Sequence, residues 1–159
     1  MKKTISLFLF LCFMHITCCQ RSTAQVHDEQ KANIVSEIER LFQKSLKAGE
    51  KLDIAGIKEN VDDTLKAGFI DKGHYFQSFD VLMDGFEEAV TGVDSQNFNV
   101  TNKKITVLSG NAALLTAAGD YTVLTSNGQS FKGNFAWTFI YSKIGDNWKI
   151  IHTHMSALR

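Results

Sequence analysis

Residues 136–156 read AWTFIYSKIGDNWKIIHTHMS, and this stretch decides the fold. Apolar or aromatic residues alternate with other residues on both sides of Gly145-Asp146. Alternation is typical of β-strands, because successive side chains point to opposite faces of a sheet. We therefore predict two long antiparallel strands joined by a tight turn at Gly145-Asp146.

The predicted hairpin has one aromatic face. Counting outward from the turn pairs Ile144 with Asn147. The same register places Tyr141, Phe139 and Trp137 opposite Ile150, His152 and His154, respectively. One face of the last strand is then predicted to hold Trp148, Ile150, His152, His154 and Ser156. Two imidazoles would lie on an aromatic surface, which is suited to binding but names no substrate.

The N-terminus predicts export. Met1-Lys2-Lys3 is a short basic region, and an apolar run follows to about Ile16. Ser22-Thr23-Ala24 supplies small residues at the two positions that a signal peptidase reads. The run is too short for a comfortable membrane span, and no similar run follows. We therefore predict a secretory signal peptide over residues 1–24, no transmembrane segment, and a mature domain over residues 25–159.

All three cysteines, Cys12, Cys18 and Cys19, lie in this predicted leader. Cleavage after Ala24 leaves a domain without cysteine and so without disulfides, despite an oxidising destination. Ile16-Thr17-Cys18-Cys19 also resembles a bacterial lipobox in which Cys19 carries the lipid. Because Cys18 is an unusual residue before such a cut, we favour soluble export to the periplasm or the exterior and keep a lipid anchor as the alternative.

Charge and motifs exclude several classes of protein. The chain has 17 basic and 17 acidic residues among 159. Removal of Lys2, Lys3 and Arg21 leaves 14 basic residues and a net charge of −3, which argues against nucleic-acid binding. The length suits one domain. The sequence has no mature cysteine, no Gly-x-Ser-x-Gly motif and no phosphate-binding glycine loop, so we predict neither covalent catalysis nor a cofactor.

The remaining chain predicts helices first and a sheet afterwards. Apolar spacing predicts a helix over residues 28–48, and Asp53 and Ser78 are candidate caps of two shorter helices. Two short strands surround Asp71-Lys72-Gly73. Longer strands are predicted over residues 97–108, 112–124, 131–142 and 148–156. Helices segregated onto one face of an antiparallel sheet make an α+β fold, and a strongly curved sheet over three helices leaves a conical cavity at its open end.

The chain resembles the nuclear transport factor 2-like superfamily in three features. These are the helix order, the sequence GFIDKG at 68–73 and the sequence NWKIIHTHMS at 147–156. The nearest group is the SnoaL-like one, and the closing motif is also similar to the association domain of calcium/calmodulin-dependent kinase. The resemblance covers residues 28–156 and implies a cone-shaped fold. The superfamily includes isomerases, dehydratases, transport factors and assembly hubs, so the resemblance leaves the activity open.

His152 and His154 lie two residues apart, so on a strand they would point the same way, as metal ligands do. Only five residues follow His154, and none is acidic. His27 and His74 are distant in sequence and belong to no companion motif. We therefore predict no metal site and expect the two histidines to line the cavity or to support the sheet.

A cofactor-independent lyase or isomerase is an alternative to simple binding. If Asn127-Gly128 is a two-residue turn, Phe135 pairs with Asp120, which then joins the aromatic face. His154 or Asp120 would be the base, and Tyr75 or His152 the proton donor. A bulge or register slip would move Asp120 to solvent. The resemblance places Tyr75 near the cavity mouth, but the tyrosine and second buried acid of the isomerases are not recognisable, which argues against isomerase activity.

The leading prediction is binding of a small, largely apolar molecule in the cone. The predicted ligand-binding residues are His152, His154, Trp137, Phe139, Tyr141 and Thr116. The opposite face of the hairpin is predicted to hold Ile140, Ile151 and Met155 between Thr138 and Thr153. This face is apolar for a solvent-facing sheet and predicts a homodimer through the sheet. A non-catalytic oligomerisation module is the third alternative, implied by the resemblance to the kinase association domain.

Overall fold

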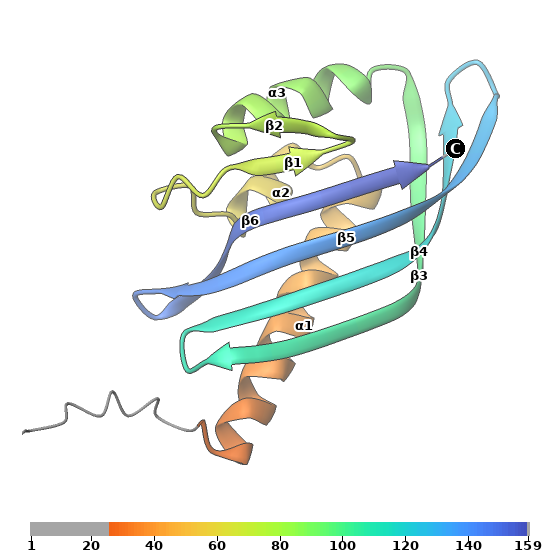
Figure 1. Ribbon diagram of the computed structural model, residues 1–159. Helices are drawn as coiled ribbons and strands as arrows, with labels where there is room; N and C mark the ends of the chain where they lie inside the picture. Colours follow the sequence, from red (N-terminus) through yellow and green to blue (C-terminus); the bar gives the residue numbers. More distant parts are fainter. Residues whose placement is uncertain (1–25, 159) are drawn as a thin grey trace, which may run out of the picture.

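The computed structural model describes residues 26–158, which form three helices and six strands (Figure 1). The predicted signal peptide and lipobox lie outside these residues. No helix in the described part of the chain is long and apolar enough to cross a membrane.

The helices begin and end where the sequence supplies caps. Helix α1 (Asp28–Glu50) buries a stripe of apolar residues at three- and four-residue spacing. Helix α2 (Ile54–Glu59) begins after Asp53, whose side chain accepts a hydrogen bond from the Gly56 backbone N–H. Helix α3 (Phe79–Ala89) begins after Ser78, which accepts from the Val81 N–H in the same way.

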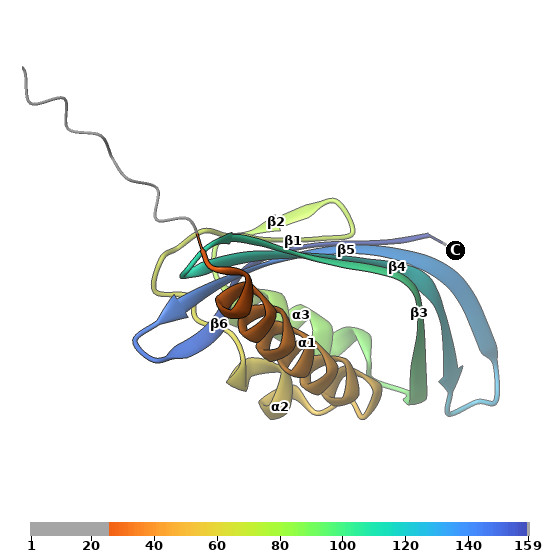
Figure 2. The same cartoon turned by 90° about the horizontal axis from the view of Figure 1, so that it is seen from below.

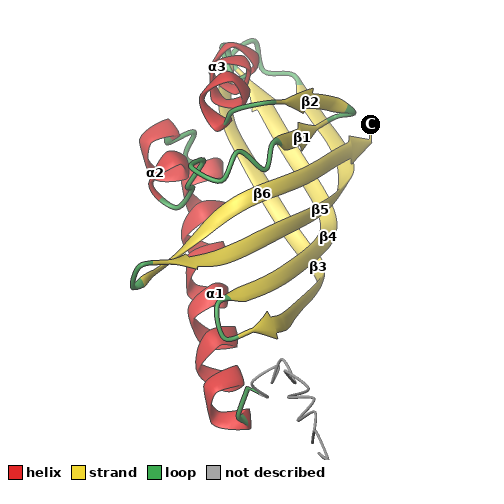
Figure 3. Ribbon diagram, turned by 60° about the vertical axis from the view of Figure 1, so that its left-hand side comes forward, coloured by secondary structure: helices red, strands yellow, loops and turns green. Residues whose placement is uncertain are grey.

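All six strands belong to one sheet with the order β2-β1-β6-β5-β4-β3. The strands are β1 (Phe69–Asp71), β2 (His74–Phe76), β3 (Val93–Ser109), β4 (Ala112–Thr125), β5 (Ser130–Ile144) and β6 (Asn147–Leu158). Neighbours are antiparallel except β1 and β6, which are parallel. The short β1–β2 hairpin extends the sheet beyond β6 (Figure 3).

The sheet is strongly curved, and the helices lie on its concave side (Figure 2). We call this side the inner face and the other side the outer face. The predicted α+β class, with three helices on a curved sheet, is confirmed, and the sheet does not close into a barrel.

Two groups of buried side chains hold the helices to the inner face. The larger group joins α1 to β4, β5 and β6 and includes Phe42, Leu115, Phe139, Tyr141 and Trp148. The smaller group joins β1 to α3 and consists of Phe69, Phe79, Leu82 and Met83. Burial of one such side chain stabilises a fold by about 1.5–3 kcal/mol, so these contacts fix which face of each strand is inner.

A β-bulge in β6 contradicts the predicted face of the histidines. Tyr141 pairs with Ile150, but Ile140 pairs with His152, so one extra residue is inserted between the two pairs. Trp148 and Ile150 therefore face the helices, as predicted. His152, His154 and Ser156 lie on the outer face instead, because a one-residue shift moves every following side chain to the other side.

The same bulge reverses the predicted outer surface. Thr153 pairs with Phe139 and Met155 pairs with Trp137, so both face inward, and Thr153 is buried. The prediction that Thr153 and Met155 contribute to an exposed dimer face is therefore wrong. Ile140 and Thr138 do lie on the outer face, paired with His152 and His154.

The predicted register of Asp120 is also wrong. Four residues, not two, separate β4 from β5, and the Thr125 N–H donates to the Gln129 carbonyl across them. Phe135 consequently pairs with Gly119, and Asp120 pairs with Asn134 on the outer face. The exposed Asp120 carboxylate accepts a hydrogen bond from the Asn99 side chain at 2.8 Å.

Candidate functional site

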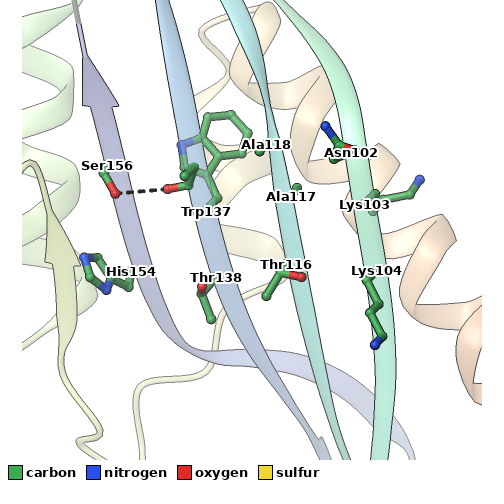
Figure 4. A pocket seen from close by; sticks show the side chains of 11 residues that line it. Asn102, Lys103, Lys104, Thr116, Ala117, Ala118, Trp137, Thr138, His154 and Ser156 are labelled. Carbon is green, nitrogen blue, oxygen red and sulfur yellow. Dashed lines mark hydrogen bonds between the residues drawn. The ribbon is translucent and has the colours of Figure 1, made fainter.

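A shallow groove of about 470 Å³ lies on the outer face across β3 to β6 (Figure 4). The strand register places Lys104, Thr116, Thr138 and His154 in one row across it. A second row beside it holds Asn102, Ala118, Ala136 and Ser156. Figure 4 shows the short side chains of Thr116 and Thr138 between the lysines of β3 on one side and His154 on the other, with Trp137 beside them. The groove therefore offers a shallow surface of small residues, with one lysine and one histidine at its margins.

His152 connects two parts of the sheet. Its Nδ1 lies 2.7 Å from the Gly68 carbonyl oxygen. Because a carbonyl can only accept, Nδ1 carries the proton of this hydrogen bond. The Tyr75 ring covers Gly68 from β2, and a Cβ at Gly68 would lie 2.5 Å from that ring. His152 and Tyr75 thus hold the segment before β1 against the outer face, and Tyr75 remains 64% exposed.

The three predicted catalytic residues lie apart from one another. Tyr75 is on β2 and His154 on β6, with β1 between them. Asp120 is on β4, two strands from His154 on its other side. His154 is exposed, and the described residues contain no group of three His, Cys, Asp or Glu side chains placed to hold a metal. Their catalytic roles stay predictions, and the register does not bring the three together.

Two of the predicted aromatic ligand-binding residues belong to the core. The Phe139 ring packs edge-on against Phe42 of α1, with ring centroids 5.8 Å apart. Tyr141 is completely buried, and its hydroxyl has no hydrogen-bond partner within the described chain. Burial raises the pKa of Tyr141, and the charge of Glu39 acts in the same direction. Tyr141 therefore stays a neutral phenol under α1.

Trp137 differs from these two residues because it is only partly buried. Its ring stacks on Phe135 at 4.0 Å and meets the Phe98 ring edge-on at 5.0 Å. Figure 2 shows that β3, β4 and β5 curve beyond the helices toward the turn that joins β4 to β5. We call the partly buried inner-face residues around Trp137 the open-end cluster, which consists of Phe98, Val100, Tyr121, Trp137 and Met155.

Two glycines make room for the open-end cluster. Gly133 lies under the Tyr121 ring, where a Cβ would come 2.6 Å from the tyrosine hydroxyl. Gly119 lies beside the Phe135 ring and against the backbone of Asn99. Larger residues at either position would push these aromatic rings out of place, so the glycines shape the inner surface.

Asp71 is an inner-face residue, although its sequence Asp71-Lys72-Gly73 indicates only a turn. It pairs with Met155 of the open-end cluster and follows the buried Phe69 by two residues, so it shares the inner face. Burial raises the pKa of the Asp71 carboxyl, and the charges of Lys72 and His74 oppose this only in part. The sequence shows that Asp71 shares a face with Phe69, because the two residues are two apart on a strand. Only the pairing of β1 with β6 shows that this face is the inner one.

A model of the SnoaL-like domain matches residues 38–159 of this chain. The chain belongs to the SnoaL-like family. The predicted resemblance is therefore confirmed. Among curated proteins, none matches this SnoaL-like chain significantly.

Solved structures show the same fold at low sequence identity. A nuclear transport factor 2-like protein from Salmonella enterica is 20% identical, with 81% of this chain and 94% of that chain covered and a TM-score of 0.71. The association domain of Caenorhabditis elegans CaMKII is 18% identical, with 82% and 99% covered and a TM-score of 0.64. A type 2 hexachlorocyclohexane dehydrochlorinase is 13% identical, with 84% and 90% covered and a TM-score of 0.70. These likenesses establish the fold of the SnoaL-like domain alone.

Proposed function

We propose that this SnoaL-like domain is exported and binds a small, largely apolar molecule at the open end of its inner face. The observation that carries the proposal is the open-end cluster, whose aromatic and apolar side chains are only partly buried. Concave, mostly apolar surfaces with a few polar groups are the usual sites of small-molecule binding. Covering about 100 Å² of this surface would contribute about 2.5 kcal/mol to binding.

The residues support ligand binding alone better than they support a catalysed reaction. The similar dehydrochlorinase shows that this fold accommodates an enzyme, and a cofactor-independent lyase or isomerase remains the alternative function. Such an enzyme needs a base and a donor facing one ligand. Asp120 and His154 lie on the outer face, across the sheet from the open-end cluster, so they do not supply that pair to an inner-face ligand.

We expect native mass spectrometry of the wild-type domain, purified from its own host, to detect a co-purifying small molecule. Replacing Trp137 by leucine should remove most of it, because the indole is the largest apolar side chain of the open-end cluster. The same spectrum gives the mass of the mature chain, which would begin at Gln25 after soluble export or at a lipidated Cys19.

His154→Ala is the matched control for this experiment. His154 is on the outer face, so its loss should leave the bound molecule in place. Loss of the molecule in His154→Ala but not in Trp137→Leu would contradict an inner-face site. An empty wild-type protein would favour the oligomerisation module.

We also propose that the domain forms a homodimer through its outer face. The shape of the outer groove supports this second proposal. In the middle of the outer groove, the outward-facing side chains of Thr116, Ala118, Ala136 and Thr138 are short, so a second sheet can approach it closely. The similar domain of C. elegans CaMKII is named an association domain. A two-fold interface uses the same patch on both subunits, and a shallow, self-complementary sheet face suits that geometry.

Replacing Thr116 by arginine is expected to convert the dimer into a monomer, as measured by light scattering. The substitution puts a long charged side chain in the middle of the groove, where two copies would bring like charges together. Ser130→Arg, at the exposed start of β5, makes the same chemical change away from the groove and should leave the dimer intact. A monomeric wild type would refute the outer-face interface.

A further inference from the structure

We propose that the molecule bound at the open end carries a protonated amine, which pairs with the Asp71 carboxylate. This inference rests on the proposed binding at the open-end cluster. It adds the chemical class of the ligand: a flat apolar body for the aromatic side chains and a cationic nitrogen for the carboxylate.

The first support is the position of Asp71. The register forms one row on the inner face from Asp71 through Met155 to Trp137. Neighbouring strands lie about 4.8 Å apart, so the Asp71 and Trp137 backbones are about 10 Å apart across Met155. An aromatic group stacked on Trp137 with a short aminoalkyl arm spans this separation. The thioether of Met155 between them offers an adaptable apolar contact.

The second support is the incomplete solvation of the carboxylate. The Asp71 side chain is only 28% exposed. The charged groups that face it are Lys72, whose Nζ is 3.9 Å from Oδ2, and His74 on the paired strand. From α3 and β6, the elements packed against β1, the facing side chains are apolar. A carboxylate held at an apolar wall gains most from a cation that arrives with its own apolar surface.

The third support is the electric field of α3. This helix carries the four acids Asp80, Asp84, Glu87 and Glu88 and no basic residue. Lys58 pairs with Asp80 at 3.0 Å, near the start of the helix, and the last turn has no basic side chain. The negative end of the helix dipole lies at that last turn, from which the chain runs to the start of β3 (Figure 2). Acidic side chains and dipole together attract cations to the open end.

The test compares three probes with one aromatic body: 2-naphthylmethylamine, 2-naphthylmethanol and 2-naphthoate. Ligand-observed NMR titration of the full mature domain measures their affinities. We expect the amine to bind about tenfold more tightly than the alcohol, and the carboxylate to bind most weakly. Amine binding should weaken as the pH falls through the raised pKa of Asp71, because the protonated carboxyl has no charge.

Asp71→Asn should abolish the preference for the amine and leave the affinity for the alcohol unchanged. This variant should fold, because burial already disfavours the charged form of Asp71. Asp84→Asn removes the same charge from an exposed position on α3 and should retain most of the preference. Equal binding of amine and alcohol, or a preference that survives Asp71→Asn, overturns the inference but not the open-end site. Absence of binding by all three probes overturns both.

Discussion

Replacing Phe42 by alanine is expected to lower the free energy of unfolding by about 3–5 kcal/mol, as measured by urea denaturation followed by far-UV circular dichroism. Phe42 is 1% exposed and lies between α1 and the inner face. Its ring meets Phe139 edge-on, and Lys103 Nζ lies 5.5 Å from the ring centroid. The truncated side chain would leave a cavity at the main contact between the long helix and the sheet.

An ion pair beside Phe42 also joins α1 to the sheet. Lys103 reaches from β3 to the Glu39 carboxylate, one turn before Phe42. Burial acts to raise the pKa of Glu39, but hydrogen bonds from Lys103 and Gln43 and the charge of Lys103 hold it below its ordinary value. This ion pair therefore stabilises the fold at neutral pH and is lost as the pH falls through the lowered pKa of Glu39.

Val35→Ala is the control for Phe42→Ala. Val35 is on the same helix but 37% exposed, and alanine has the higher helix propensity. We expect its free energy of unfolding to change by less than about 0.5 kcal/mol. A similarly small change in Phe42→Ala would mean that α1 contributes little to the core, and the assignment of the inner face would need revision.

The fold could be predicted from the sequence because its signals are local and repeated. Each helix is specified by residues of its own segment. The apolar stripe marks α1, and the caps Asp53 and Ser78 mark the starts of α2 and α3. Alternation on both sides of Gly145-Asp146 specified the β5–β6 hairpin, and Ile144 does pair with Asn147. Each of these signals agrees with the others, so the class and the order of elements followed.

The site could not be predicted as well, because it depends on single-residue shifts. The bulge between Ile150 and His152 leaves no mark in the alternating sequence, yet it moves both histidines to the outer face. The Asn127-Gly128 pair suggested a two-residue turn, but Thr125 and Gln129 close a longer one. Bulges and loop lengths reflect packing of the whole sheet, which the local pattern of β6 or β4 does not contain.

These shifts divide the sheet into two surfaces with different chemistry. The inner face holds the partly buried aromatic open-end cluster and, beside its Met155, the Asp71 carboxylate. On the outer face, the bulge in β6 brings His154 into a row with Thr138 and Thr116. A ligand on one face and a second subunit on the other therefore do not compete, and each can be tested by substitutions that leave the other face unchanged.

Replacing Gly119 by alanine is expected to destabilise the domain by about 3 kcal/mol and to abolish ligand binding at the open end. Gly119 pairs with Val100 on one side and Phe135 on the other, next to the bulge between Val100 and Asn102. A Cβ there would overlap with the Asn99 carbonyl oxygen and lie 3.0 Å from the Phe135 ring. Relief of this overlap requires β3 to move, and β3 carries Phe98 of the open-end cluster.

Gly85→Ala separates this effect from a general cost of removing glycine. A Cβ at Gly85 meets no atom within 4 Å, and the residue is inside α3. Alanine there should raise the free energy of unfolding by about 0.5–1 kcal/mol, because glycine weakens helix interiors. Thermal denaturation and probe titration of both variants measure the difference. If Gly119→Ala were as stable as the wild type and still bound 2-naphthylmethylamine, the close approach of β3 and β4 would not shape the site.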